Sequence, residues 1–217
     1  FAKMADEPEE SPDFSELTEV EAKLKSLHEE LEEKMVELDR TYNRKKRPLF
    51  DERIKVCSTI PNFWLNTFLN HRDLQHYVTA SDYDCLRHLT ALDVREIDEE
   101  GYQGTRYVFQ FSKNSFFNNT ELHKEFKYHK ESGELVLSTA KIDWKQGMNL
   151  IDKSDKGAEG TGKRDEPEDD NDTFFTWFRE DEDSEVPIGE WLREDIWKDP
   201  FTYFCGEDNG EDEDDEG

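Results

Sequence analysis

The sequence contains only three cysteines, Cys57, Cys85 and Cys205, and no Cys-x-x-Cys pair. A small secreted fold held by disulfides needs an even and denser set of cysteines, and a zinc ribbon needs two close pairs. The sequence therefore argues against both classes of protein. We expect the chain to work in a reducing compartment.

Long apolar runs are also missing. No stretch approaches the roughly 18 apolar residues that a membrane-spanning helix requires. The N-terminal residues lack the apolar core of a signal peptide, so we expect neither membrane insertion nor secretion. Phe1–Lys3 precede Met4, and we expect these residues to be foreign to the natural chain.

Motifs for catalysis or cofactor binding are incomplete. Gly157–Lys163 has the spacing of a phosphate-binding loop, but Arg164 stands where that loop needs Ser or Thr to bind Mg²⁺. The acids from Asp181 resemble the start of a calcium loop, but Val186 and Leu192 replace its required Gly and Glu. The histidines lack metal-ligand spacing, and no Gly-x-Ser-x-Gly elbow occurs. We therefore expect no enzymatic activity, no metal and no cofactor.

Basic residues are few, with 28 Lys and Arg against 55 Asp and Glu. Residues 165–172, 180–185 and 206–217 hold 19 of those acids and no Lys or Arg, which leaves 36 acids, 28 bases and a net charge of −8 elsewhere. Such local negative charge repels nucleic acids and anionic lipids and attracts basic proteins. The alternative is that these runs only increase solubility.

The first apolar pattern is helical and predicts one long amphipathic helix over residues 15–56. Pro48 is expected to kink or interrupt it, after which Leu49, Phe50 and Ile54 can continue the same face. The stripe needs a partner helix, and no second segment of similar length and period exists, so we predict a homodimer. A helix packed only on its own domain is the alternative. The predicted dimerisation residues are Leu17, Val20, Leu24, Leu27, Leu31, Met35, Leu38 and Tyr42.

The remaining pattern predicts a separate α/β domain over residues 57–205. Pro61 is expected to open a helix, and Ser81 with Asp84 to cap a short one. From Leu92 the apolar period becomes two, which predicts a four-stranded antiparallel meander with turns at 101–104 and 132–133. Residues 152–172 are expected to form a flexible loop, and two aromatic clusters after it to form short helices that cover the sheet. Residues 1–14 and 206–217 are expected to be disordered, and the fold class is α+β.

Several aromatic motifs together resemble the nucleosome assembly protein family, and within it the SET branch. The similarity extends in order from Leu17 to Cys205. The motifs are Ile60–Trp64 with Asn70 and His71, Lys124–Phe126, Glu131–Gly133, Ile142–Lys145, Phe174–Phe178 and Asp195–Pro200.

This resemblance implies a homodimer of paired long helices in which each α/β "earmuff" domain binds core histones on its lower face. In the SET branch the aromatic segment and the loop after it contribute to that face, although Arg179 departs from the family pattern. The resemblance implies a nuclear protein, with the cytoplasm left open, that contacts DNA or chromatin only indirectly. The alternative function is a regulatory inhibitor that masks a phosphatase or the substrates of histone acetylation. The predicted histone-binding residues are Thr176, Glu180, Asp181, Glu182, Asp183 and Glu185.

Overall fold

The computed structural model describes residues 14–152, 173–179 and 187–206. The predicted flexible loop, apart from Asp152, and the predicted tail, apart from Gly206, lie outside these ranges, as does the near phosphate-loop motif. The chain divides into two compact units, Phe1–Asp51 and Glu52–Gly217. The described part of the first unit is helical, and the second combines helices with a sheet.

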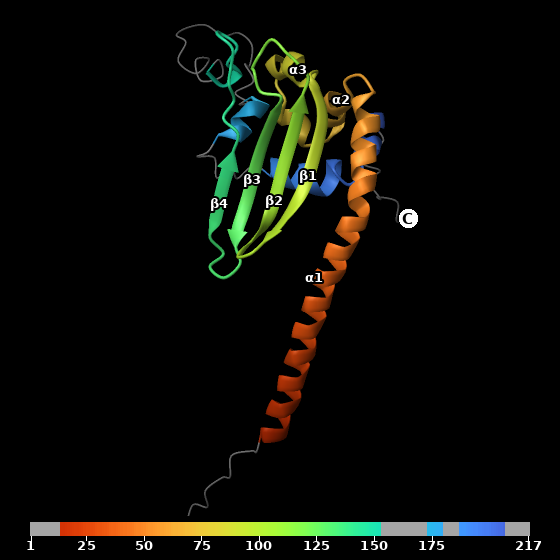
Figure 1. Ribbon diagram of the computed structural model, residues 1–217, viewed down its shortest axis with the longest axis vertical. Coiled ribbons are helices and arrows are strands. Elements are labelled where there is room, and N and C mark those ends of the chain that lie inside the picture. Colours follow the sequence, from red (N-terminus) through yellow and green to blue (C-terminus); the bar gives the residue numbers. More distant parts are fainter. Residues whose placement is uncertain (1–13, 153–172, 180–186, 207–217) are drawn as a thin grey trace, which may run out of the picture. The chain divides into compact units, whose positions relative to one another are not determined.

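One long helix, α1, extends from Ser15 to Ser58 (Figure 1). The predicted long helix is therefore confirmed, and it ends at Ser58 rather than at residue 56. Pro48 lies inside α1 without ending it, because a proline removes a single backbone donor while the turns on either side keep their own hydrogen bonds. Exposed ion pairs one turn apart, such as Glu30–Lys34 and Arg47–Asp51, add modest support along its length.

The second unit is built on an antiparallel sheet whose strands pair in the order β1-β2-β3-β4. This confirms the predicted meander. Gly101 and Gly133 occupy the turns with positive φ, at 80° and 70°, where glycine is favoured. The strands are β1 (Leu89–Glu99), β2 (Tyr102–Phe111), β3 (Glu121–His129) and β4 (Leu135–Thr139).

Gly104 corrects one detail of the sequence interpretation, which placed it in the first turn. It lies inside β2, paired with Ile97 and Lys127. A Cβ atom on Gly104 would lie 1.8 Å from the carbonyl oxygen of Phe126. Glycine is therefore required at this position by the close approach of β2 and β3. A sequence pattern does not distinguish such a glycine from one in a turn.

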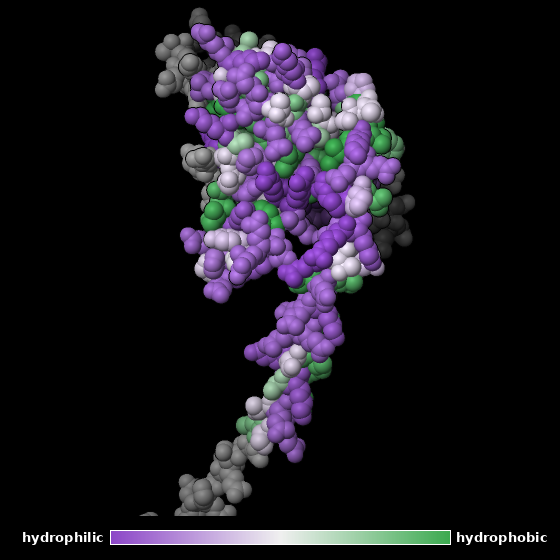
Figure 2. All heavy atoms as spheres, viewed as in Figure 1, coloured by the Kyte–Doolittle hydropathy of each residue, from purple (hydrophilic) through white to green (hydrophobic). Residues whose placement is uncertain are grey.

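One face of the sheet carries the apolar residues that alternate along its strands. Leu92, Phe109 and Leu122 lie side by side at its centre and are fully buried. Figure 1 shows the short helices behind the strands, which leaves the face toward the viewer open. That open side of the second unit is predominantly hydrophilic (Figure 2). The sheet thus has the one wet face that antiparallel sheets tolerate.

Short helices form the covering layer. α6 packs on α2, where Asn70 donates to the carbonyl oxygens of Tyr203 (2.8 Å) and Phe204 (3.2 Å). The elements are α2 (Phe63–Asn70), η1 (Leu74–Tyr77), α3 (Ala80–Leu86), η2 (Phe174–Phe178), α5 (Ile188–Glu190), η3 (Trp191–Ile196) and α6 (Pro200–Cys205).

The cap of α3 differs from the sequence prediction, which chose Ser81 and Asp84. Thr79 is the N-cap, and it forms a reciprocal capping box with Asp82. Both pairs have the required spacing of three residues, but Asp82 is fully buried and can be reached by donors from elsewhere in the fold. The spacing of the residues alone therefore did not show which of the two pairs forms the cap.

Cys57 and Cys85 are buried, whereas Cys205 is exposed. Burial raises the pKa of the thiol of Cys57, and burial together with the nearby Asp82 raises that of Cys85. Among the described helices, none combines the length and the apolar character needed to cross a lipid bilayer.

Candidate functional site

The aromatic segment Thr173–Arg179 forms the centre of the candidate site. Its middle, η2, is a 3-10 helix whose five residues are all buried. Phe174 and Trp177 pack against Phe109 of β2, with ring centroids 6.0 and 5.9 Å away. The predicted short helix over the sheet is therefore observed. The acidic run 180–185 follows directly after Arg179 in the sequence.

Asp82 holds the N-terminal end of this segment. Its Oδ2 accepts hydrogen bonds from the backbone N–H of Thr79 (2.8 Å), the Thr79 hydroxyl (2.9 Å) and the backbone N–H of Phe174 (3.0 Å). Its Oδ1 accepts a bond from the Thr173 hydroxyl. Burial raises the pKa of the Asp82 carboxyl, and these hydrogen bonds oppose that shift. One carboxylate therefore joins α3 to the start of the aromatic segment.

Lys124 and Thr139 hold the C-terminal end. The Lys124 ammonium donates to the carbonyl oxygen of Trp177 and, at 3.4 Å, to that of Arg179. The Thr139 hydroxyl donates to the carbonyl oxygen between them, that of Phe178, at 3.1 Å. Lys124 and Thr139 are cross-strand partners on β3 and β4. Three consecutive carbonyl groups are thus held by one pair of neighbouring side chains.

Thr176, a predicted histone-binding residue, lies inside this anchored segment and is buried. Its hydroxyl donates to the carbonyl oxygen of Thr173 at 2.8 Å, and its own carbonyl accepts from the N–H of Arg179 at 2.8 Å. These bonds give Thr176 a part in the turn of η2. Its contact with histones stays a prediction, and the five predicted acids of 180–185 lie outside the described residues.

A groove borders the end of the aromatic segment. It combines apolar and aromatic side chains with the cations Lys141 and Arg179. Its lining residues are Thr139, Lys141, Ile142, Trp144, Ile151, Phe178 and Arg179. In the described part of the chain, no group of three or more His, Cys, Asp or Glu residues is placed to hold a metal ion.

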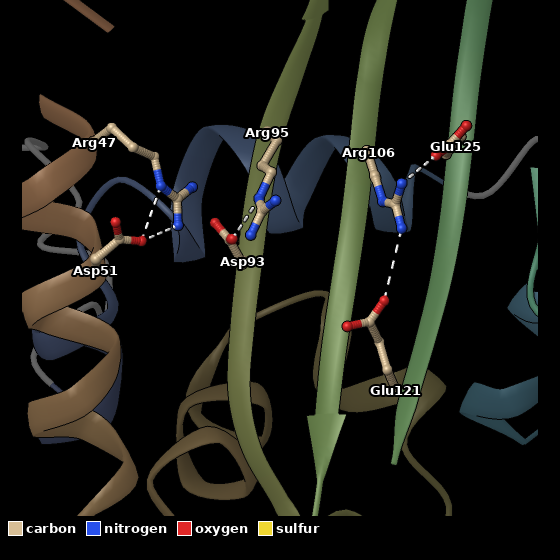
Figure 3. Close-up of polar contacts among 7 residues, drawn as sticks. All are labelled: Arg47, Asp51, Asp93, Arg95, Arg106, Glu121 and Glu125. Atoms are coloured by element: carbon tan, nitrogen blue, oxygen red, sulfur yellow. Dashed lines mark hydrogen bonds and ion pairs between the residues drawn. The ribbon is translucent and has the colours of Figure 1, made fainter. Parts of the chain in front are cut away.

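The open face of the sheet carries a network of ion pairs (Figure 3). Arg95 contacts Asp93 at 2.7 Å on β1, and Arg106 on β2 contacts Glu125 at 3.0 Å and Glu121 at 3.6 Å on β3. Since each of these carboxylates already faces a guanidinium, the network offers little unbalanced negative charge to a basic partner. The strongly acidic segments of the chain lie elsewhere in its sequence.

The apolar stripe of α1 forms a second candidate surface. Its eight predicted dimerisation residues are between 49% and 62% exposed in the single chain. Leu49 and Val56 follow Tyr42 at intervals of seven residues and are 65% and 56% exposed. Phe50 and Ile54, which were expected on the same face, are half-buried instead, because they lie on another side of the helix.

A model of the family described as "Nucleosome assembly protein (NAP)" matches residues 55–216. The chain belongs to this family. The chain is similar to "NAP1-related protein 2" of Arabidopsis thaliana, which is 31% identical over 92% of this chain and 78% of the relative. "Protein SET" of Drosophila melanogaster is 30% identical over 90% of this chain and 74% of the relative. The predicted family and its SET branch are confirmed.

Solved structures share the fold of this chain. Nucleosome assembly protein S from Plasmodium falciparum superposes with a TM-score of 0.70 and 26% identity, covering 88% of this chain and 99% of its own. The Vps75 histone chaperone gives a TM-score of 0.63 at 19% identity, covering 87% and 96%. The second of these supports the fold alone.

Asp82 and Lys124, the two residues that anchor the aromatic segment, were not identified as site residues from the sequence. Asp82 lies about 90 residues before the segment that it holds, and Lys124 about 50. Lys124 does carry a signal, because it occupies an inward position between Leu122 and Phe126 in an alternating strand. A lysine at such a position requires a specific partner.

Proposed function

We propose that this chain is a non-enzymatic histone chaperone of the nucleus. It binds core histones, shields them from nonspecific contacts with DNA, and assists the assembly or disassembly of nucleosomes. The observation that supports this proposal most is the anchored segment Thr173–Arg179, which is held at both ends and continues directly into the acidic run 180–185. The acids are thereby attached to the folded core rather than only to a terminus.

The chemistry of histones explains why such an arrangement is useful. Histones are strongly basic and bind DNA by neutralising phosphates, in a process that weakens as salt increases. An acidic run competes for the same Lys and Arg side chains. Because single exposed ion pairs contribute only about 0–1 kcal/mol, binding rests on many weak contacts and is readily reversed by DNA. The chaperone can therefore transfer histones as well as hold them.

We propose that a second copy of the chain covers the stripe on α1. Single exposed apolar side chains are ordinary on protein surfaces, but an aligned row over most of a long helix is not. Each copy offers the same stripe, and a twofold interface between identical stripes buries both at once. Homodimerisation is thus the proposed role of Leu17, Val20, Leu24, Leu27, Leu31, Met35, Leu38 and Tyr42.

The proposed histone site is tested by replacing five acids with their amides: Glu180→Gln, Asp181→Asn, Glu182→Gln, Asp183→Asn and Glu185→Gln. This change removes five charges and nearly preserves shape. We expect affinity for core histones to fall roughly tenfold or more, since each lost ion pair contributes up to about 1 kcal/mol. The remaining binding should depend less steeply on salt. Fluorescence titration of labelled histones across a salt series measures both effects.

The matched comparison is deletion of residues 206–217, which removes eight acids. The run 180–185 lies in the sequence between the buried residues Phe178 and Ile188, whereas 206–217 joins the core only through α6. We therefore expect the acids of 180–185 to lose less conformational freedom on binding, so the deletion should weaken binding less than the five amides do. Both variants should remain dimeric, since none of the changed residues lies on the stripe of α1. If the deletion is the more damaging change, the histone site lies elsewhere.

A further inference from the structure

We propose that the outer edge of β4, together with the groove that borders the aromatic segment, docks an extended segment of a partner protein. The segment adds a strand to the sheet, alternates apolar with polar residues, and places one carboxylate beside Lys141. This inference goes beyond the proposed function, because the site contains none of the acids that are proposed to bind histones.

Strand β4 offers a row of backbone groups to such a segment. In the described sheet it pairs with β3 alone and therefore forms an edge (Figure 1). The N–H of Ala140 donates to the carbonyl oxygen of His123 at 2.8 Å, so this cross-strand pair is a hydrogen-bonded one. Bonded and non-bonded pairs alternate along an antiparallel ladder. Leu135, Leu137 and Thr139 therefore direct their N–H and C=O groups away from β3, where an added strand can bond them.

The two edges of the sheet differ in how they are protected. Edge strands usually carry charged residues or proline, which discourage pairing with another chain. Strand β4, with the sequence Leu-Val-Leu-Ser-Thr, has neither, and Val136 is 42% exposed. The edge of β4 is therefore suited to strand addition. Strand β1, at the other edge, has the charged residues Asp93, Arg95, Glu96, Asp98 and Glu99.

The groove begins where this edge ends, since Thr139 is the last residue of β4 and also lines the groove. Trp144 and Phe178 offer aromatic surface to a side chain of the partner. Among the described residues that line the groove, the charged ones are Lys141 and Arg179, both of them cations. A carboxylate is therefore complementary to this end of the site, and a Lys or Arg side chain is not.

The wall of the groove that follows β4 is held by the folded core. The ring of Trp144 packs against those of Phe117 and Phe175, with ring centroids 5.5 Å apart in each case. The side chain of Asn119 donates to the carbonyl oxygen of Lys141 at 3.2 Å. A wall that is already in place loses little conformational freedom on binding, which favours recognition of a particular side chain.

The charge of the site distinguishes this partner from two other occupants. A histone segment is basic, so it is repelled by the cations of the groove. A second copy of the chain carries a net charge of −27, as the first does, and at this edge no long apolar stripe offsets their repulsion. A mainly neutral segment with one carboxylate avoids both penalties. We expect it to pair antiparallel, as the other strands do, with its carboxylate N-terminal to its apolar residues and opposite Lys141.

The probe is the peptide Asp-Thr-Val-Thr-Val-Thr-Val, acetylated at its N-terminus and carrying a neutral fluorophore at its C-terminus. We expect saturable binding to the protein, measured by fluorescence anisotropy. Replacing its Asp by Asn should weaken binding by up to roughly fivefold, the effect of one exposed ion pair. N-methylation of its three valines, whose N–H groups face β4 in the antiparallel register, should abolish binding because the added strand loses its donors.

Two variants of the protein test the two parts of the site. Leu137→Pro should abolish binding and leave the fold intact, because the N–H that it removes points away from β3. Circular dichroism and the melting temperature check the fold. Lys141→Glu should weaken binding at least roughly fivefold, whether or not the strand accepts proline. Lys55→Glu is the matched control and should bind normally, because Lys55 is an exposed lysine of the same compact unit that does not line the groove.

Absence of saturable binding, or equal binding of the N-methylated peptide, would overturn the inference. Equal affinity for the Asp and Asn peptides, or an unchanged affinity in Lys141→Glu, would do the same. A mass that increases with concentration in the parent protein but not in Leu137→Pro would assign the edge to a second copy instead. The protein that carries the five amides should bind the probe normally, whatever its affinity for histones. Failure of the histone site and failure of this site are therefore distinguished.

Discussion

We expect replacement of Leu27 and Leu31 together by Glu to convert the proposed dimer, near twice 25.7 kDa, into a monomer. Each dimer loses four leucines from the proposed interface, and burial of each stabilises by about 1.5–3 kcal/mol. The same change places four carboxylates where the stripes meet. The combined loss is comparable to the whole binding free energy of a nanomolar dimer, roughly 12 kcal/mol. Light scattering at micromolar concentration measures the mass.

Val36→Glu is the matched control for this experiment. Val36 is an exposed apolar residue of the same helix, but it lies off the stripe. The same chemical change there should leave the dimer intact. The second compact unit begins at Glu52 and has its own aromatic core, so circular dichroism of the Leu27/Leu31 variant should retain the signal of the sheet. A monomeric parent protein, or a double variant that still dimerises, would contradict the assignment of the stripe.

Asp82→Ala should lower the free energy of unfolding by roughly 3–5 kcal/mol, because the half-buried donors of Thr79 and the buried donors of Thr173 and Phe174 lose their acceptor. Asp82→Asn should cost only about 1 kcal/mol. Its amide oxygen can replace Oδ2, and its amide nitrogen can donate to the Thr173 hydroxyl. Urea denaturation followed by tryptophan fluorescence measures both values. Equal damage from the two variants would show that the charge of Asp82, rather than its acceptor geometry, is what the fold requires.

The parent protein and Asp82→Asn should also differ in how their free energies of unfolding depend on pH. Burial raises the pKa of Asp82 above its ordinary value of 3.8, so protonation of this carboxyl is more favourable in the folded state than in the unfolded state. The stability from this group is fully present below the unfolded pKa and is lost as pH rises through the folded pKa. Asp82→Asn has no such titration. The parent protein should therefore lose stability relative to Asp82→Asn as pH increases from 3.8. A difference that grows in the opposite direction would contradict this.

The sequence predicted those features that depend on local periodicity. The stripe from Leu17 gave the length of α1, and the change of period near Leu92 gave the four strands and their order. Periodicity was less informative where one position serves two purposes. Gly104 is a residue type typical of turns, but it lies in a strand. Ser81 has the spacing of a helix cap, but Thr79 is the residue that caps α3.

The anchors of the candidate site depend on contacts that no local pattern contains. Asp82 and Lys124 meet the aromatic segment only after α3, the sheet and η2 have packed together. The inward position of Lys124 indicated an unusual environment, but its partners are backbone carbonyl groups, which every residue possesses. The register between β3 and β4, which places Thr139 beside Lys124, is likewise a property of the assembled sheet.

The unequal burial of the three cysteines makes the natural chain ready for site-selective labelling. Cys205 is exposed at the end of α6, whereas Cys57 and Cys85 are enclosed and their thiols resist ionisation. A maleimide dye reacts with an accessible thiolate, so it should attach to Cys205 in the folded protein. The dye would then lie directly before the acidic residues 206–217 in the sequence. Its anisotropy could then follow histone binding and release without any engineered cysteine.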